Sequence, residues 1–317
     1  MYPRYEWSKL AHSLPLQVLS VTSEGIAMAN ELSIRNMTRS EVNELVDWAA
    51  AEGWNPGIHD ADLFWATDPD AFIAADLQGE LIGGGAITSY DGKYGFMGFF
   101  IVRPEYRGRG LGNTIWQARL KRLIDRLLPG ATIGMDGVFA MQDYYARGGF
   151  VFSHRNLRFR AEITRRATNP SLQSGHVIPL DAVPFDQVVE YDRTCFPAKR
   201  TTFLTGWIAQ NDALALGYQR DNELHGYGVI RRCREGCKVG PLFADDSEVA
   251  SELYTQLAVF ARGGPLFLDA PENNPAAMAL VHREGMSEVF GCARMYLGPP
   301  PGVAHNRIFG VTTFELG

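Results

Sequence analysis

Residues 99–112 constrain the fold of this chain more than any other segment. They read FFIVRPEYRGRGLG, an apolar strand that ends near Pro104, a loop with three glycines and a helix-like run from Leu111. Glycines permit a tight concave turn in which backbone N–H groups converge. A helix that begins at such a turn adds the positive end of its dipole. The segment therefore predicts a cradle for a phosphate group.

The spacing within this segment narrows the choice of ligand. A Rossmann loop would read Gly-x-Gly-x-x-Gly and a P-loop needs Gly-Lys-Ser/Thr, and neither pattern is present. The spacing Arg107-x-x-Gly110-x-Gly112, directly after a strand ending in Val-x-Pro, resembles the coenzyme A pyrophosphate loop of the GCN5-related N-acetyltransferases, the GNAT superfamily. The alternative is a glycine-rich turn on a basic surface that holds no ligand.

The resemblance implies acetyl-CoA as co-substrate and direct transfer of the acetyl group to an amine through a tetrahedral intermediate. It also implies that backbone N–H groups at the strand end hold the pantetheine arm, and that the loop holds the pyrophosphate. The positions of this chain that match are Phe100, Ile101, Val102, Arg107, Gly108, Arg109, Gly110, Leu111 and Gly112.

A general acid is also implied by the resemblance. Tyr145, in the sequence YARGGF, occupies the position of the tyrosine that in many GNAT enzymes lies near the coenzyme A sulfur. A neutral phenol can protonate a departing thiolate. The adjacent Tyr144 could hold this position instead, so the acid is assigned only to within one residue. The structural alternative is that Tyr145 is packed in the core without a catalytic role.

Composition bounds the class of protein. A chain of 317 residues suits two domains, and 46% hydrophobic with 21% charged residues is ordinary for a globular protein. The net charge of −6 argues against nucleic acid as the main partner. No apolar run approaches the roughly 18 residues of a membrane helix, and residues 1–30 lack a signal-peptide layout. We expect a cytoplasmic protein without membrane or nucleic-acid partners, and a homodimer is left open.

The four cysteines do not read as a disulfide framework or as a metal site. Cys233 and Cys237 have no second Cys/His pair at metal-binding spacing. We expect reduced structural thiols and no metal.

The order of the predicted elements occurs twice along the chain. In the first copy, alternating and helical spacing predict strands over 32–37, 71–76, 81–89, 94–102, 132–138 and 150–163 and helices over 38–53, 111–128 and 141–147. In the second, they predict strands over 176–179, 213–218, 224–230, 238–243, 265–269 and 287–296 and helices over 185–195, 248–261 and 276–284. An internal duplication indicates two domains of one fold.

Each copy follows the order of a GNAT domain, and the second resembles the divergent second domain of tandem GNAT proteins. We expect an α/β (α+β) fold of two tandem GNAT-like domains, each with a mixed, mostly antiparallel sheet flanked by helices. The predicted boundaries are an N-terminal extension at 1–30, a catalytic domain at 31–163, a linker at 164–175, a divergent domain at 176–299 and a tail at 300–317.

The second copy lacks the glycine loop. Asp245 and Asp246 stand at the equivalent helix start, where they would cap the helix but repel a pyrophosphate. We expect this domain to bind no coenzyme A and to wall the acceptor cleft. Its candidate substrate contacts, which alternatively cap helices and turns, are Arg200, Trp207, Glu272 and Asn273.

A loop in the first copy offers acceptor-binding residues. Residues 52–62 read EGWNPGIHDAD and, by the resemblance, cover the acceptor site. Carboxylates attract a cation and an aromatic face stabilises it, so Trp54, His59 and Asp62 are candidate substrate-binding residues and Asp60 the candidate base. The structural alternative is a helix N-cap at Asp60 or Asp62, with Trp54 in the core and His59 exposed.

Together these patterns predict an acetyl-CoA-dependent N-acetyltransferase. The expected acceptor is the amine of a small molecule, because a pocket shared by two domains is enclosed. The alternative is a non-catalytic acyl-CoA-binding or ligand-sensing protein that kept the phosphate cradle and lost the chemistry.

Overall fold

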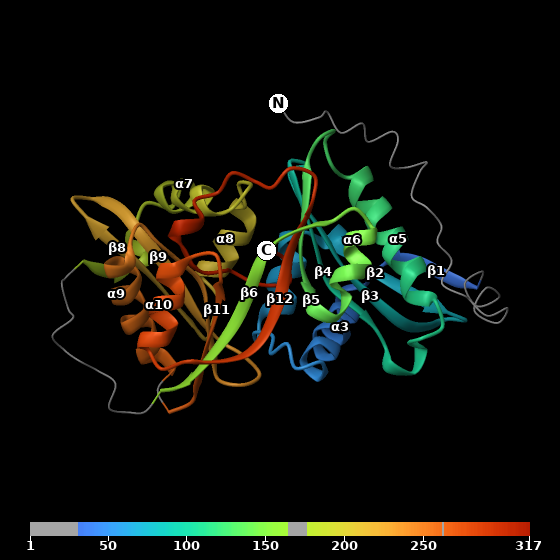
Figure 1. Ribbon diagram of the computed structural model, residues 1–317, viewed down its shortest axis with the longest axis horizontal. Coiled ribbons are helices and arrows are strands. Elements are labelled where there is room, and N and C mark those ends of the chain that lie inside the picture. Colours follow the sequence, from blue (N-terminus) through green and yellow to red (C-terminus); the bar gives the residue numbers. More distant parts are fainter. Residues whose placement is uncertain (1–30, 164–175, 262) are drawn as a thin grey trace.

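The structure is a computed structural model that describes residues 31–163, 176–261 and 263–317 (Figure 1). The extension expected at 1–30 and the linker expected at 164–175 lie outside the described residues. Within the described ranges, no helix combines the length and the apolar character that crossing a bilayer requires.

The first half follows the order predicted from the sequence, with one helix added. Its elements are β1 (Leu32–Asn36), α3 (Arg39–Ala51), α4 (Asp60–Thr67), β2 (Phe72–Leu77), β3 (Glu80–Tyr90), β4 (Tyr94–Val102), α5 (Leu111–Asp125), β5 (Thr132–Val138), α6 (Gln142–Arg147) and β6 (Val151–Glu162). Helix α3 begins at a capping box, in which the Thr38 hydroxyl accepts from the Glu41 N–H and the Glu41 carboxylate accepts from the Thr38 N–H. Helix α4 begins at Asp60, at the end of the segment expected to be a loop, where the sequence indicated a helix start only as an alternative.

The second half repeats the plan with one more helix and a short final strand. Its elements are β7 (Val177–Pro179), α7 (Phe185–Cys195), α8 (Thr201–Ile208), β8 (Ala213–Arg220), β9 (Glu223–Arg232), β10 (Cys237–Ala244), α9 (Ser247–Ala258), β11 (Pro265–Pro271), α10 (Pro275–Arg283), β12 (Ser287–Leu297) and β13 (Ile308–Gly310). Helix α8 and strand β13 were not predicted.

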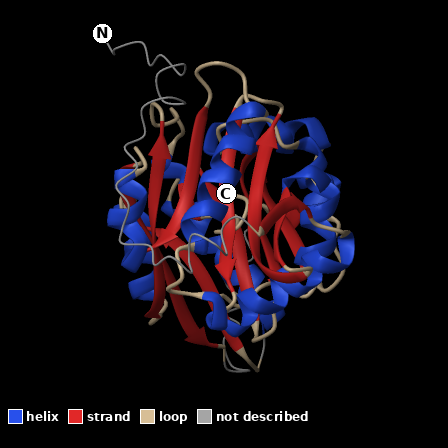
Figure 2. Cartoon of the chain, turned by 90° about the vertical axis from the view of Figure 1, so that its right-hand side faces the viewer, coloured by secondary structure: helices blue, strands red, loops and turns tan. Residues whose placement is uncertain are grey.

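The strands of both halves form one sheet, in the order β1-β2-β3-β4-β5-β12-β6-β11-β10-β9-β8-β7, with β13 beside β10. The pairs β4–β5 and β10–β11 are parallel and the other pairs are antiparallel. Helices cover both faces of the sheet (Figure 2). The mixed, mostly antiparallel α/β fold expected from the sequence is confirmed.

The two halves exchange their long final strands. Strand β6 of the first half pairs with β11 of the second, and β12 of the second half pairs with β5 of the first. The exchanged strands also pair with each other at the centre of the molecule (Figure 1). The halves therefore share backbone hydrogen bonds, and the spatial division of the sheet does not follow the chain order.

Residues 308–317 pack into the molecule, although the sequence suggested only a tail at 300–317. Strand β13 pairs with β10, and residues 311–317 are buried. The Tyr90 hydroxyl of the first half donates to the Leu316 carbonyl oxygen at 2.7 Å. This segment consequently joins the two halves at the point where the cavity described below lies.

Candidate functional site

Strands β4 and β5 separate at the centre of the first half. They pair in parallel only from Tyr94 to Met97 on β4 and from Thr132 to Met135 on β5, although both strands continue beyond these residues. The register of β3 and β4 shifts at the same level, and Phe99 has a φ of 51°. A strand that leaves its partner exposes unpaired backbone groups to a ligand. The opening is therefore where an extended ligand chain can pair with the edge of β4.

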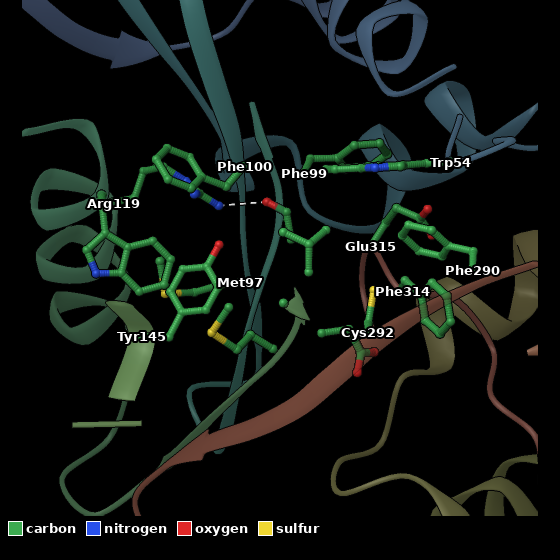
Figure 3. A pocket seen from close by; sticks show the side chains of 16 residues that line it. Trp54, Met97, Phe99, Phe100, Arg119, Tyr145, Phe290, Cys292, Phe314 and Glu315 are labelled. Carbon is green, nitrogen blue, oxygen red and sulfur yellow. Dashed lines mark hydrogen bonds between the residues drawn. The ribbon is translucent and has the colours of Figure 1, made fainter. Parts of the chain in front are cut away.

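A cavity occupies this opening, with about 550 Å³ of empty space including the part open to solvent. Its lining residues come from both halves of the chain: Trp54, Met97, Gly98, Phe99, Phe100, Trp116, Arg119, Met135, Asp136, Gly137, Val138, Tyr145, Phe290, Cys292, Phe314 and Glu315. Figure 3 shows two groups, with Arg119, Phe100 and Tyr145 on one side and Trp54, Phe290, Phe314 and Glu315 on the other. The cavity therefore has two chemically different ends.

Tyr145 lies at the first end, on α6. It is 4% exposed and packs against Trp116 with ring centroids 4.8 Å apart. Burial raises the pKa of Tyr145 to about 12, against the opposing effect of Arg119. Its hydroxyl therefore stays protonated at neutral pH. The neighbouring Tyr144 instead donates its hydroxyl proton to Asn113 Oδ1 at 2.8 Å.

Arg119 lies beside Tyr145 and was not expected from the sequence. Its Nη2 donates to the carbonyl oxygens of Ala86 and Gly98, and its guanidinium lies 4.9 Å from the Phe100 ring centroid. Its Nε and Nη1 have no hydrogen-bond partner among the described residues. Burial lowers the pKa of Arg119 to about 9, which still leaves a cation at neutral pH. The sequence feature that could have indicated Arg119 is its spacing, because a charged residue four positions after Ile115 lies on the inward face of α5.

Trp54 lies at the second end of the cavity and also packs against the hydrophobic core, so its role as a substrate-binding residue stays a prediction. Residues of the second half and of β6 hold its loop. Arg158 Nη1 donates to the Trp54 carbonyl oxygen at 2.6 Å, and Lys238 Nζ donates to the Asn55 carbonyl oxygen at 2.9 Å. The position of Trp54 in the cavity thus depends on the contact between the two halves.

The glycine loop has the geometry of an anion cradle. Gly108 and Gly110 have φ values of 76° and 82°, which favour glycine. Gly110 is the N-cap of α5, and no side chain caps this helix. The helix is therefore left with N–H groups and a positive dipole end free for a phosphate. Arg107 is turned back, with Nε donating to the Val102 carbonyl oxygen and Nη2 to Glu52.

The equivalent helix start in the second half is already occupied. Asp246 is the N-cap of α9, and its carboxylate accepts from the N–H groups of Glu248 and Val249. Asp245 bonds to Tyr191 and His225. A pyrophosphate at this helix start would need the same backbone N–H groups, and it would have to displace the Asp246 carboxylate from them.

The other residues of the 52–62 loop do not line the cavity. Asp60 is fully buried, accepts from the Gly57 N–H at 2.7 Å and pairs with Arg231 at 2.9 Å. Burial alone would raise the pKa of Asp60, but Arg231 and Lys238 hold it below the usual range. We therefore do not place the catalytic base at Asp60. The alternative of an N-cap at Asp60 or Asp62 is also wrong, because His59 is the N-cap of α4, Asp60 is its first residue, and no described side chain caps this helix.

His59 and Asp62 also have partners outside the cavity. His59 Nε2 lies 3.0 Å from Asp212, and Asp62 pairs with Arg39. The second-half residues considered as substrate contacts are placed elsewhere too. Arg200 pairs with Asp192, Trp207 donates to the Gly240 carbonyl oxygen, and Glu272 pairs with Arg155.

Known proteins resemble both halves of the chain. Residues 39–150 match the family described as "Acetyltransferase (GNAT) family", and residues 188–310 match "Acetyltransferase (GNAT) domain". A holothin acyltransferase from Pseudoalteromonas sp. (strain SANK 73390) is 26% identical over 272 residues, which cover 86% of this chain and 90% of that protein.

Two solved structures share the fold. A putative acetyltransferase from Pyrococcus horikoshii has a TM-score of 0.76 and 23% identity, covering 90% of this chain and 96% of its own. A tandem GNAT protein from the clavulanic acid biosynthesis pathway has a TM-score of 0.58 and 14% identity, covering 85% of this chain and 100% of its own.

Proposed function

Because the chain is an acyltransferase of the GNAT family with two GNAT domains in tandem, we propose that it transfers the acetyl group of acetyl-CoA to the amine of a small molecule. The observation that carries this proposal is the cavity at the separation of β4 and β5. It brings Tyr145, a protonated acid, and the edge of β4 into one space that residues of both halves line.

The donor side of the proposed site uses the first half of the chain. The uncapped start of α5 and the loop at 107–112 fit a pyrophosphate, because their backbone N–H groups converge where two glycines have positive φ values. When bound, acetyl-CoA supplies the activated acyl group as a thioester. Tyr145 holds a proton for the departing sulfur, and Arg119 adds a nearby positive charge that stabilises developing negative charge.

Protonation of the thiol in the cavity supports direct transfer of the acetyl group from acetyl-CoA to the amine. Among the described residues that line the cavity, Cys292 alone carries a thiol. Burial raises the pKa of Cys292 well above its ordinary value, with Asp136 adding to the effect. A thiol that stays protonated is a poor nucleophile, so the amine itself is the proposed attacking group. The cytoplasmic location and the domain boundaries expected from the sequence remain part of this proposal.

Incubation with acetyl-CoA and a panel of primary amines tests the proposed function. We expect free thiol to appear at a rate that depends on the amine, together with an N-acetylated product detected by mass. Tight coenzyme A binding without thiol release over the whole panel would instead favour the ligand-sensing alternative.

A further inference from the structure

Two carboxylates line the cavity, and they differ in their partners. Asp136 is neutralised by a two-point contact with Arg294, at 2.8 and 2.6 Å, and also accepts from Asn156. Glu315 is 3% exposed, and its Oε2 has no hydrogen-bond partner among the described residues. A buried charged oxygen without a partner is costly. Glu315 is therefore the carboxylate of this cavity that is open to a ligand.

The backbone around Glu315 is fixed, so its place in the cavity is defined. The Thr313 hydroxyl accepts from the N–H groups of Glu315 and Leu316 at 3.2 and 2.9 Å. Tyr90 holds the Leu316 carbonyl oxygen, and Gly98 of β4 packs against the Glu315 backbone. The side chain stands in the second end of the cavity (Figure 3).

Charged groups from four elements surround Glu315. Burial raises its pKa; Lys238 of β10, Arg158 of β6 and Arg231 of β9 oppose this effect, and Asp60 of α4 adds to it. The two arginines have carboxylate partners, whereas the lysine bonds to backbone carbonyl oxygens. Arg158 pairs with Asp269, Arg231 with Asp60, and Lys238 donates to the Asn55 carbonyl oxygen. They favour an ionised Glu315, although no ion pair with it is present among the residues that the structure describes.

The walls beside Glu315 are aromatic. Trp54, Phe290 and Phe314 line the same end of the cavity, and the Arg158 guanidinium lies 5.5 and 5.0 Å from the centroids of the two phenylalanine rings. Flat apolar walls next to one free carboxylate suit a ligand with a flat apolar group and an ammonium.

We propose that Glu315 binds the ammonium of a primary amine carrying an aromatic group, and that it is the base that deprotonates this amine before acyl transfer. The inference rests on the proposed function, whose acceptor class it specifies. It places the base in the second half of the chain and the acid, Tyr145, in the first.

The proton balance of the step is complete. The ammonium gives one proton to Glu315, and the neutral amine nitrogen then forms a bond to the thioester carbon. When the carbon–sulfur bond breaks, the sulfur takes a proton from Tyr145, and Tyr145 recovers one from the nitrogen that becomes the amide. Glu315 returns its proton to solvent when the products leave, so one proton is released per turnover.

The test compares wild type with Glu315→Gln, Glu315→Asp and the control Glu235→Gln, whose side chain is exposed and pairs with Arg160. Calorimetry measures binding of 2-phenylethylamine and of its neutral analogue 2-phenylethanol. We expect wild type and Glu235→Gln to bind the amine at least about 10-fold tighter than the alcohol, and Glu315→Gln to lose this preference.

A second measurement is kcat/KM for 2-phenylethylamine and acetyl-CoA against pH. Wild type should lose activity on the acid side, with an apparent pKa above that of an ordinary glutamate. In Glu315→Gln, kcat/KM should fall by about 10²-fold or more, and the loss of activity on the acid side should disappear, as expected for a general base. Glu315→Asp should keep the loss of activity on the acid side.

Thermal unfolding separates catalysis from a structural role. A carboxyl whose pKa is raised in the folded state binds protons more tightly there, so its contribution to stability falls as pH rises through that pKa. Glu315→Gln should therefore be at least as stable as wild type at pH 8. An unchanged amine preference and an unchanged pH profile in Glu315→Gln would overturn the proposal. An amine preference that depends on Glu315, without turnover of any amine of the panel by wild type, would keep the binding site and refute the proposed function.

Discussion

Gly98 and Glu315 lie so close together that a Cβ atom on Gly98 would come within 1.9 Å of the Glu315 carbonyl oxygen. Gly98 is on the strand that opens to form the cavity, and Glu315 belongs to the segment that closes the cavity from the second half. The absence of a side chain at position 98 thus allows the two halves to meet at the site.

Gly98→Ala should disrupt this contact. The added methyl group meets backbone atoms, so the 311–317 segment must move, at a cost of about 1–3 kcal/mol in the free energy of unfolding. Displacement of a cavity wall by about 1 Å should lower kcat/KM for the amine by about 10²-fold. Urea unfolding and steady-state kinetics measure both effects. Gly302→Ala, where no atom of the described residues lies within 4 Å of the new Cβ, is the control. Wild-type kinetics in Gly98→Ala would show that the contact is irrelevant to the site.

Gly110→Val should abolish tight coenzyme A binding. A β-branched residue is strained at the φ of 82° found here, by an amount on the order of 1–3 kcal/mol, and its side chain would enter the phosphate cradle. Gly130→Val is the matched control. Gly130 has a φ of 84° and lies beyond the other end of α5, and a Cβ there would have no atom of the described part of the chain within 4 Å. Calorimetric titration with coenzyme A compares the two. Equal affinity for coenzyme A in both folded variants would show that the pyrophosphate does not bind at residues 107–112.

Tyr145→Phe should lower kcat by about 10²-fold or more and leave coenzyme A affinity nearly unchanged, because only the acidic proton is removed. The pKa of about 12 means that no alkaline loss of activity from Tyr145 is expected below about pH 10. Tyr144→Phe is the control, since its hydroxyl bonds to Asn113. A large loss at Tyr144 with none at Tyr145 would move the acid by one residue.

Asp60→Asn should destabilise the protein by roughly 3–5 kcal/mol, because it leaves the fully buried Arg231 cation without its partner. Asp62→Asn breaks only an exposed pair with Arg39 and should cost less than about 1 kcal/mol. Urea unfolding at pH 7 measures both. A small stability loss at Asp60 together with a 10²-fold loss in kcat would return the base to that residue.

The sequence predicted the elements whose evidence is local. Strands β4 and β5 have the predicted bounds, and the Thr38 capping box is present, because alternation and capping depend on near neighbours in the chain. The uncapped, glycine-led start of α5 and the Asp246 cap on α9 also follow from residues adjacent in sequence. The pyrophosphate assignment at this loop nevertheless remains a proposal.

The features that depend on distant pairing were not predicted. Strands β6 and β12 occupy equivalent places in the two copies, and alternation cannot indicate which sheet neighbours each one takes. The segment 311–317 is short and irregular, so no periodicity placed Glu315 in the cavity. The ion pair of Asp60 with Arg231 could not be predicted from the sequence, because the two residues are 171 positions apart.

We propose that the first half binds the acyl donor and that the second half shapes the acceptor side of the cavity. Calorimetric titration of the wild-type chain with coenzyme A tests this division most directly. We expect one site per chain, since the cradle at 107–112 is open and Asp246 occupies the amides at the start of α9. Two equivalent sites per chain would contradict it.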